Sequence, residues 1–312
     1  MLKDPQALIV RKKSWGDYVL LALRSPRIAA KAKPGQFLMI RVSDQGSPLL
    51  RRPFSIHTRE NGAVEVFFAR AGAGTEILAE KNPGETLDIL GPLGNGFRTG
   101  TKRRRLPGDQ KTKDRGPGGR FKGRTVYLVG GGRGIAPLYF LALELRRAGA
   151  CPRVFYGGKT EADLPLLEKL ASREFEVFVS TDDGSLGFRG LVSSMLEREL
   201  KRVFPEVTPS GPPHRTRRSP LSGPAAASRP AQIFACGPDP MMEKIAALAA
   251  DFKIPAQFSL ESIMGCGIGA CWGCVKKIRR GAGAEWVKVC EDGPVFEGRE
   301  IVWDKEIKTD HS

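Results

Sequence analysis

Apolar and polar residues alternate along the first hundred residues of the chain. The alternation is clearest in four stretches: DYVLLALRS at 17–25, QFLMIRVS at 36–43, AVEVFFAR at 63–70 and ETLDILG at 85–91. A period of two places successive side chains on opposite faces of a strand. Short strands at regular intervals are typical of antiparallel barrels and sandwiches. We expect residues 1–100 to form an antiparallel β-barrel.

The pattern changes after residue 124, where continuous apolar strands alternate with helical stretches. TVYLVGGG, RVFYGG, EFEVFVST and AQIFACGP predict strands that are buried on both faces. IAPLYFLALELRRAG, VSSMLERELK and PMMEKIAALAADF lie between or after them and have helical character. Such an alternation indicates a doubly wound parallel sheet with helices on both faces. We therefore expect an α/β domain at residues 124–256.

The last segment, residues 257–312, contains glycines, cysteines and only short strands such as CVKKIRR and EWVKVC. A unit of this size buries little apolar surface. A bound metal cluster would supply stability that its own core lacks. The expected fold class is thus a multidomain protein of β and α/β parts with a small C-terminal domain.

The net charge of +16 is concentrated in two segments. Residues 101–124 hold ten Lys or Arg against two Asp, and residues 206–230 hold four Arg against one Glu. Both contain few large apolar residues and much Gly, Pro or Ser, which is typical of disorder. We expect disordered basic insertions at 101–123 and 206–230. Neither interleaves aromatic with basic residues, so a nucleic-acid platform is disfavoured.

The bulk composition also bears on the compartment. No stretch reaches the roughly 18 consecutive apolar residues of a membrane span, and the start MLKDPQALIVRKK lacks the apolar core of a signal peptide. We therefore expect a cytoplasmic protein. In a reducing cytosol, six cysteines are better explained as metal ligands, catalytic groups or core thiols than as disulfides.

The strongest chemical signal is the cysteine run ESIMGCGIGACWGCV at 261–275. Its spacing is Cys266-x4-Cys271-x2-Cys274, and Cys290 follows after fifteen intervening residues. This is the pattern of a plant-type [2Fe-2S] ferredoxin, whereas structural zinc sites favour two short pairs. Zinc and unligated thiols stay open as alternatives. The interspersed glycines would let backbone N–H groups approach the sulfides.

Two glycine-rich turns follow predicted strands of the α/β domain. LVGGGRGIAPL at 128–138 and FACGPDPMM at 234–242 both precede helices, whose N-terminal ends attract phosphates. Ligands of open parallel sheets bind at the carboxyl ends of the strands. The spacing is not the usual dinucleotide fingerprint, and a tight turn alone would also explain it. Cys236, at the end of a buried strand, is equally well explained as a packing residue.

RRPFSI at 51–56 lies in the expected barrel. Arg52 is able to pair with a phosphate, Phe54 to stack on an aromatic ring, and Ser55 to hydrogen-bond a ring nitrogen. His57 follows directly and, as a lone histidine, is expected to be a surface or packing residue. The chain shows no Ser/His/Asp or paired-carboxylate pattern, which argues against hydrolase chemistry.

In this order, the three regions resemble the ferredoxin–NADP reductase superfamily and, within it, the electron-transfer subunits of class B dihydroorotate dehydrogenases. The resemblance covers nearly the whole chain except the basic insertions. In that family a barrel motif binds FAD, and it matches Arg52, Pro53, Phe54 and Ser55. A later strand and turn continue the flavin site, matching Phe68, Ala69, Arg70, Gly74 and Thr75. GPLGNGF at 91–97 matches a segment that closes the barrel. Phe54 replaces the tyrosine common in the superfamily.

The resemblance assigns the remaining motifs as well. The pyridine-nucleotide half matches Gly130, Gly131, Gly132, Gly134, Cys236, Gly237 and Pro238. The cluster ligands match Cys266, Cys271, Cys274 and Cys290. Trp272, between two of these cysteines, is expected to be buried under the loop, with packing against the partner subunit as the alternative. The implied cofactors are FAD and a [2Fe-2S] cluster, with NAD(H) as a diffusible substrate.

The implied function is a redox relay in pyrimidine biosynthesis. A catalytic partner subunit oxidises dihydroorotate on its own FMN, and electrons pass through the cluster and FAD to NAD. Two copies of each subunit assemble in that family, and this chain would have no dihydroorotate site. Two alternatives stay open: a gamma-type reductase subunit of a hydrogenase or sulfite reductase on the same scaffold, and a zinc-containing nucleic-acid-binding protein.

Overall fold

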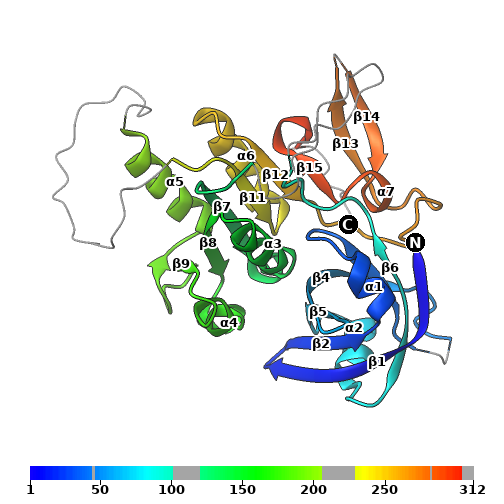
Figure 1. The fold of residues 1–312 in the computed structure, drawn as a ribbon. Coiled ribbons are helices and arrows are strands. Elements are labelled where there is room, and N and C mark those ends of the chain that lie inside the picture. Colours follow the sequence, from blue (N-terminus) through cyan, green and yellow to red (C-terminus); the bar gives the residue numbers. More distant parts are fainter. Residues whose placement is uncertain (44–45, 101–119, 206–228, 282, 304–312) are drawn as a thin grey trace, which may run out of the picture.

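The computed structural model describes residues 1–43, 46–100, 120–205, 229–281 and 283–303. Figure 1 shows a barrel, a parallel sheet covered by helices, and a smaller unit that lies beside both. The barrel and the doubly wound sheet predicted from the sequence are confirmed. The expectations for residues 101–119 and 206–228, most of the two basic segments, lie outside the described residues.

Six antiparallel strands close the barrel in the order β1-β2-β5-β4-β3-β6. Val19, Leu21 and Leu23 point into its interior, and Leu20 faces outward against the α/β domain. One strand is therefore buried on both faces because a neighbouring domain covers its outer side. The elements of this part are β1 (Leu2–Trp15), β2 (Tyr18–Arg24), α1 (Pro26–Lys31), β3 (Phe37–Arg41), β4 (Arg52–Glu60), β5 (Ala63–Ala69), α2 (Ala73–Glu80) and β6 (Thr86–Leu93).

The second sheet has the strand order β10-β9-β8-β7-β11-β12-β15. Its strands are parallel except β15, which pairs antiparallel with β12. Strand β7 shows why both faces are covered: Val126 and Leu128 pack toward α3, and Tyr127 and Val129 pack toward α5 and α6. The strands are β7 (Thr125–Gly131), β8 (Cys151–Gly158), β9 (Glu176–Thr181), β10 (Phe188–Arg189), β11 (Ile233–Cys236), β12 (Ala256–Ser259) and β15 (Val295–Glu297).

Within the described residues, the α-helices α3 to α6 and the 3-10 helices η1 and η2 connect these strands. They are η1 (Gly132–Gly134), α3 (Ile135–Arg147), η2 (Glu161–Asp163), α4 (Leu167–Ala171), α5 (Val192–Val203) and α6 (Asp239–Asp251). Phe121 is buried against Phe234 in the same core. Residues 120–123, which the sequence assigns to the end of a basic insertion, thus belong to the fold.

The smaller unit contains β13 (Val275–Arg280), β14 (Gly283–Lys288), α7 (Val289–Asp292) and η4 (Gly298–Glu300). It shares a core with the α/β domain, because Ile278, Val287 and Val289 belong to the same apolar cluster as Ile245 and Phe258. The sequence predicts a unit with little core of its own, and in the structure its apolar side chains pack into the core of the α/β domain. No helix in the described part of the chain is long and apolar enough to cross a membrane.

Candidate functional site

The motif RPFS occupies the start of β4, next to the N-terminal end of α2. Arg52 lies across the first turn of α2, where a Cβ atom on Gly74 would come within 2.9 Å of its Nε. Gly74 is therefore needed for this close approach. A guanidinium beside the N-terminal N–H groups of a helix forms a positively charged corner that suits a phosphate.

The loop before α2 is held in one conformation by its own hydrogen bonds. The Thr75 hydroxyl accepts from the backbone N–H of Ala71 and donates to the carbonyl of Gly72, both at 2.8 Å. Arg70 pairs with Glu76 at 3.1 Å. These partners order the turn before any ligand binds, which lowers the entropic cost of binding.

Phe54 forms the base of this site. Its ring is only 6% exposed and packs against Phe68, with 5.2 Å between ring centroids. It supports the site from below and offers little open ring face for stacking in this structure. Pro53 and Ser55 keep partial exposure on β4, and Ala69 does so at the end of β5.

The two glycine turns of the α/β domain lie against one another at the carboxyl ends of β7 and β11. A Cβ atom on Gly134 would collide with the Cys236 carbonyl, and one on Gly131 would lie 2.7 Å from Met241 Sδ. Gly132 has φ +50° and open space around its Cα. The structure therefore brings Gly130–Gly134 and Cys236–Pro238 together, as the sequence predicts for one nucleotide site.

Cys236 is buried at the end of β11. Burial is the main cause that raises the pKa of its thiol, and the Glu261 carboxylate raises it further, while a hydrogen bond with Ser259 lowers it. The thiol is thus protonated at neutral pH. A reactive thiolate role is disfavoured, since the thiolate is the nucleophilic form.

Sequence reasoning missed Glu261, which follows β12 at the same edge of the sheet. Burial raises the pKa of Glu261, Arg133 lowers it and Asp239 raises it. Glu261 therefore interacts electrostatically with Arg133, with Asp239 and with the Cys236 thiol. The sequence does place Glu261 just after a predicted parallel strand. Because ligands bind at the carboxyl ends of such strands, this position could have identified Glu261 as a site residue.

Three of the four predicted cluster cysteines lie in one loop, and the fourth lies in a helix that contacts this loop. Cys266, Cys271 and Cys274 lie between β12 and β13, and Cys290 lies in α7. The Gly269 N–H donates to Cys290 Sγ at 3.1 Å, and the Cys290 N–H donates to Cys274 Sγ at 3.4 Å. Backbone donors of this kind are characteristic of the surroundings of iron–sulfur ligands.

The cysteines approach one another in two pairs. The Cys266 and Cys271 thiols lie close enough together for Cys271 to affect the pKa of Cys266, and the same holds for Cys274 and Cys290. Burial raises the pKa of Cys266, but backbone N–H groups and Cys271 lower it more, to about 7. Burial, followed by the Cys274 hydrogen bond, raises the pKa of Cys290 to about 12. Ligands must be deprotonated, which a bound metal cation favours.

This pairing fits a cluster with two irons. A zinc ion needs four ligands around a single centre. Two pairs would instead supply two cysteines to each iron of a [2Fe-2S] cluster.

The cluster loop rests on the flavin-motif barrel. Gly267 approaches Met39 of β3 so closely that a Cβ atom would lie 2.5 Å from its Sδ. Met39 is paired with Pro53 in the β3–β4 ladder. The strand paired with the RPFS strand therefore contacts the cysteine loop through the Met39 side chain.

Trp272 lies between two of the cysteines, and its side chain is exposed. It is 58% exposed and adopts φ +56°. Burial under the loop, the more favoured interpretation from the sequence, is wrong. A left-handed backbone conformation is unusual for a large side chain and here turns the indole outward.

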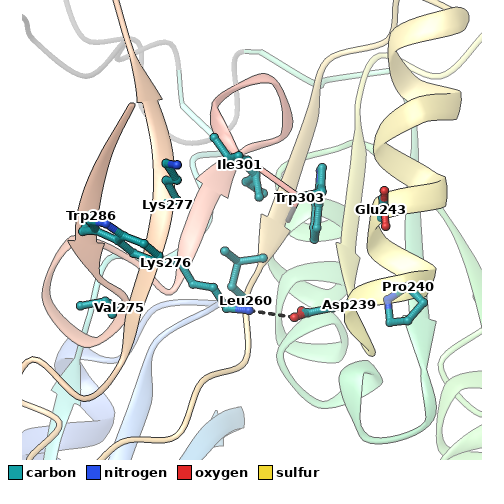
Figure 2. Close-up of a pocket in the computed structure, with 11 residues that line it drawn as sticks. Asp239, Pro240, Glu243, Leu260, Val275, Lys276, Lys277, Trp286, Ile301 and Trp303 are labelled. Atoms are coloured by element: carbon teal, nitrogen blue, oxygen red, sulfur yellow. Dashed lines mark hydrogen bonds and ion pairs between the residues drawn. The ribbon is translucent and has the colours of Figure 1, made fainter. Parts of the chain in front are cut away.

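A cavity of about 400 Å³ separates α6 from the β13–β14 hairpin (Figure 2). The ion pair between Lys276 and Asp239, at 2.7 Å, crosses it. Trp286 and Trp303 contribute aromatic walls. The cavity adjoins the second glycine motif through Asp239 and ties that motif to the cluster unit.

Comparisons with known proteins agree with this arrangement. The iron-sulfur cluster binding domain of dihydroorotate dehydrogenase B matches residues 261–302, which favours iron over zinc and confirms the predicted C-terminal domain type. A structure of an NADH-dependent reduced ferredoxin-NADP oxidoreductase aligns with 96% of this chain and 91% of its own, at 27% identity and TM-score 0.71. A ferredoxin NADP⁺ reductase from Neisseria gonorrhoeae with bound FAD and NADP shares the fold at 18% identity and TM-score 0.55, over 80% of this chain and 91% of its own.

Curated relatives align over almost the full length. The dihydroorotate dehydrogenase B (NAD(+)) electron transfer subunit of Desulforamulus reducens is 34% identical over 90% of both chains. That of a Geobacillus species is 33% identical over 97% of this chain and 100% of its own. The chain therefore belongs to the family of dihydroorotate dehydrogenase B electron transfer subunits.

Proposed function

We propose that this chain is the electron-transfer subunit of a NAD-dependent dihydroorotate dehydrogenase in the cytoplasm. It would carry electrons from the FMN of a catalytic subunit through a [2Fe-2S] cluster and FAD to NAD, as a step of pyrimidine biosynthesis. The observation that carries the proposal is the contact between Gly267 of the cysteine loop and Met39, which pairs with the flavin motif. The names of the relatives support it.

The residues fit the two resident groups. Arg52 and the first turn of α2 would hold the FAD pyrophosphate, Ser55 would face the isoalloxazine, and Phe54 would support it from below. Cys266 with Cys271, and Cys274 with Cys290, would each ligate one iron. When bound, a flavin exchanges a hydride with NAD and single electrons with an iron–sulfur cluster.

The nucleotide would bind where the two glycine turns meet. Gly130–Gly134 would cradle the NAD phosphates with the N-terminal end of α3, and Gly237 and Pro238 would line the opposite side. Cys236, protonated and buried, would shape this wall of the pocket. Arg133 and Glu261 would place opposite charges at its edge.

Exposed apolar side chains on and beside the cysteine loop support the presence of a partner. They are Leu49, Leu50, Ile263, Ile268 and Trp272. Leu50 lies beside the loop, with Cδ1 at 4.0 Å from a Cβ built on Gly265. Exposed apolar patches of this kind mark interaction sites. We propose that the catalytic subunit docks here, with two copies of each subunit in the complex.

The test is dihydroorotate-dependent reduction of NAD by this chain in complex with a catalytic subunit. Cys290→Ser should abolish that activity and bleach the iron–sulfur absorption, while NADH still reduces the FAD. Cys151→Ser, which changes an exposed cysteine of β8, serves as the matched control and should leave the activity intact. A folded protein without iron or flavin would refute the proposal, and activity supported only by a hydrogenase or sulfite reductase partner would redirect it.

A further inference from the structure

Lys288 lies at the end of β14, directly before the helix that carries Cys290. Its side chain is only 19% exposed, and its Nζ donates to the carbonyl of Gly269 at 2.9 Å. The same ammonium lies 4.9 Å from the centre of the Trp272 ring. Lys288 thus links the strand before the fourth cysteine to the loop that carries the other three.

A single residue, Gly269, connects the Lys288 ammonium to the sulfur of Cys290 by hydrogen bonds. Gly269 donates its N–H to Cys290 Sγ at 3.1 Å and accepts from Lys288 through its carbonyl. A negative charge, the Glu291 carboxylate, also lies close to Gly269. Glu291 forms an ion pair with Lys288, and its carboxylate lies 2.6 Å from a Cβ built on Gly269. A cation and an anion therefore flank the same glycine.

We propose that Lys288 and Glu291 tune the reduction potential of the cluster bound by these cysteines. The inference rests on the proposed function, because it requires a [2Fe-2S] cluster at this site. A cluster gains one negative charge on reduction. A nearby cation favours the reduced form and a nearby anion the oxidised form, and net charge near a cluster is one of the determinants of its potential.

The two partners of the pair have opposite effects. Lys288→Met removes the cation and leaves Glu291 uncompensated, so the cluster should become harder to reduce. Glu291→Gln frees the cation from its partner, so the cluster should become easier to reduce. Lys288→Arg keeps the charge and should leave the potential near that of the wild type. A purely structural role would not give opposite signs.

A matched pair elsewhere in the chain provides the control. Lys201 and Glu197 form an ion pair at 2.7 Å on α5, which Figure 1 places on the far side of the α/β domain from α7. Lys201→Met and Glu197→Gln make the same changes of net charge at that distance. Their effect on the cluster should be small, since salt screens exposed charges over about 10 Å.

The experiment is a redox titration of the full complex with dithionite, in which the EPR signal of the reduced cluster is recorded. We expect the ratio of reduced to oxidised cluster at fixed potential to fall about tenfold in Lys288→Met, a shift of about 59 mV for a one-electron couple. It should rise in Glu291→Gln. If Lys288→Met loses its cluster, Glu291→Gln decides the question.

Unchanged potentials in the charge variants would overturn the proposal, and so would shifts of the same sign in Lys288→Met and Glu291→Gln. A shift in Lys288→Arg as large as that in Lys288→Met would also refute it. The absence of any cluster signal in the wild type is a different outcome, because it would refute the proposed function itself.

Discussion

The barrel contacts the α/β domain on one side and the cluster unit on the other, and the two interfaces are built differently. Toward the α/β domain, polar side chains meet across the boundary. Toward the cluster unit, one asparagine donates to backbone carbonyls through its side chain and its own N–H, and a glycine packs tightly against a methionine. In a flavin relay, the first interface sets the position of the nucleotide relative to the flavin, and the second sets the position of the cluster.

The interface with the α/β domain centres on Lys169 of α4. Its Nζ donates to Glu65 of β5 at 2.7 Å and lies 3.2 Å from His57 Nε2. His57 Nδ1 lies 3.2 Å from the Ala136 carbonyl of α3, and its ring stacks on Tyr139. Since a carbonyl only accepts, Nδ1 donates and Nε2 accepts from Lys169.

The interface with the cluster unit centres on Asn95, just after β6. Its backbone N–H donates to the Gly293 carbonyl at 2.6 Å. Its side-chain amide donates to the carbonyls of Glu291 and Asp292 at 2.8 and 3.1 Å. Together with the contact between Met39 and Gly267, these bonds leave little room for adjustment. A packed interface of this kind is rigid, and changes of volume in it are costly.

The largest effect is expected from Gly267→Ala. Gly267 has φ +71°, and a Cβ would lie 2.5 Å from Met39 Sδ. The left-handed conformation and the overpacking together should cost about 2 to 4 kcal/mol of stability. The loop should move away from the barrel, and bound iron should fall well below that of the wild type in an iron assay.

Gly16→Ala separates the two causes. Gly16 also has a left-handed φ, +52°, but nothing lies within 4 Å of a Cβ there. It should cost only about 1 kcal/mol and retain full iron. The double variant Met39→Ala/Gly267→Ala should recover part of the lost iron because it restores space. Equal iron loss in both single glycine variants would contradict the role of the close contact.

A smaller effect is expected from Lys169→Met at the other interface. The variant leaves the Glu65 carboxylate, whose side chain is 3% exposed, with Arg11 as its remaining ionic partner, and removes the donor to His57. Loss of one partner from a buried pair should cost about 2 kcal/mol, measured by urea denaturation. NADH reduction of the FAD should slow, and iron content should stay normal.

The exposed pair on α5 again provides the control. Lys201→Met should change stability by at most about 0.5 kcal/mol. If Lys169→Met lost iron while NADH still reduced its flavin at the normal rate, the division of roles between the two interfaces would be wrong.

Much of the fold follows from local sequence patterns. Most of the contacts at the two barrel interfaces do not follow from such patterns. The period of two in β2 and β5 and the continuous apolar run in β7 are properties of neighbouring residues, so the sequence predicts them. Strand β15 has only three residues and takes its place from pairing with β12. Lys169 and His57 are 112 residues apart, and no periodicity relates them.

In the candidate site, too, some features follow from the local sequence and others depend on the fold. The spacing of Cys266, Cys271 and Cys274 predicts a ligand loop because the constraint lies within ten residues. The exposure of Trp272 depends on a left-handed backbone angle that the sequence does not reveal. The role of Lys288 and Glu291 depends on Gly269, which the fold brings between them.

The third prediction concerns pH and the interface with the α/β domain. Burial lowers the pKa of His57 well below its usual value, and Lys169 lowers it further, while the Ala136 carbonyl opposes this. Below about pH 6.5 the unfolded chain gains a proton at His57 that the folded chain does not bind. Stability should therefore fall as pH drops from 6.5, by at most about 1.4 kcal/mol per pH unit from this group.

His57→Asn removes the titrating ring while its amide can donate to the Ala136 carbonyl. The difference in unfolding free energy between pH 6.5 and pH 5.5 should be smaller in this variant by about 1 kcal/mol, measured by urea denaturation. Parallel pH curves for the two proteins would show that His57 does not stay neutral in the folded state.

The smallest effect is expected from Asn95→Ala, at the interface with the cluster unit. Two side-chain hydrogen bonds to α7 carbonyls are lost, but the backbone bond to Gly293 remains, so the cost should be about 1 kcal/mol. Because these bonds hold the end of the helix that carries Cys290, iron should be released to a chelator faster than in the wild type. Asn82→Ala is the matched control, since the Asn82 amide also donates to a carbonyl, that of Glu80, but within the barrel. Its loss should leave iron release unchanged, and equal release rates in the two variants would show that Asn95 does not secure the fourth ligand.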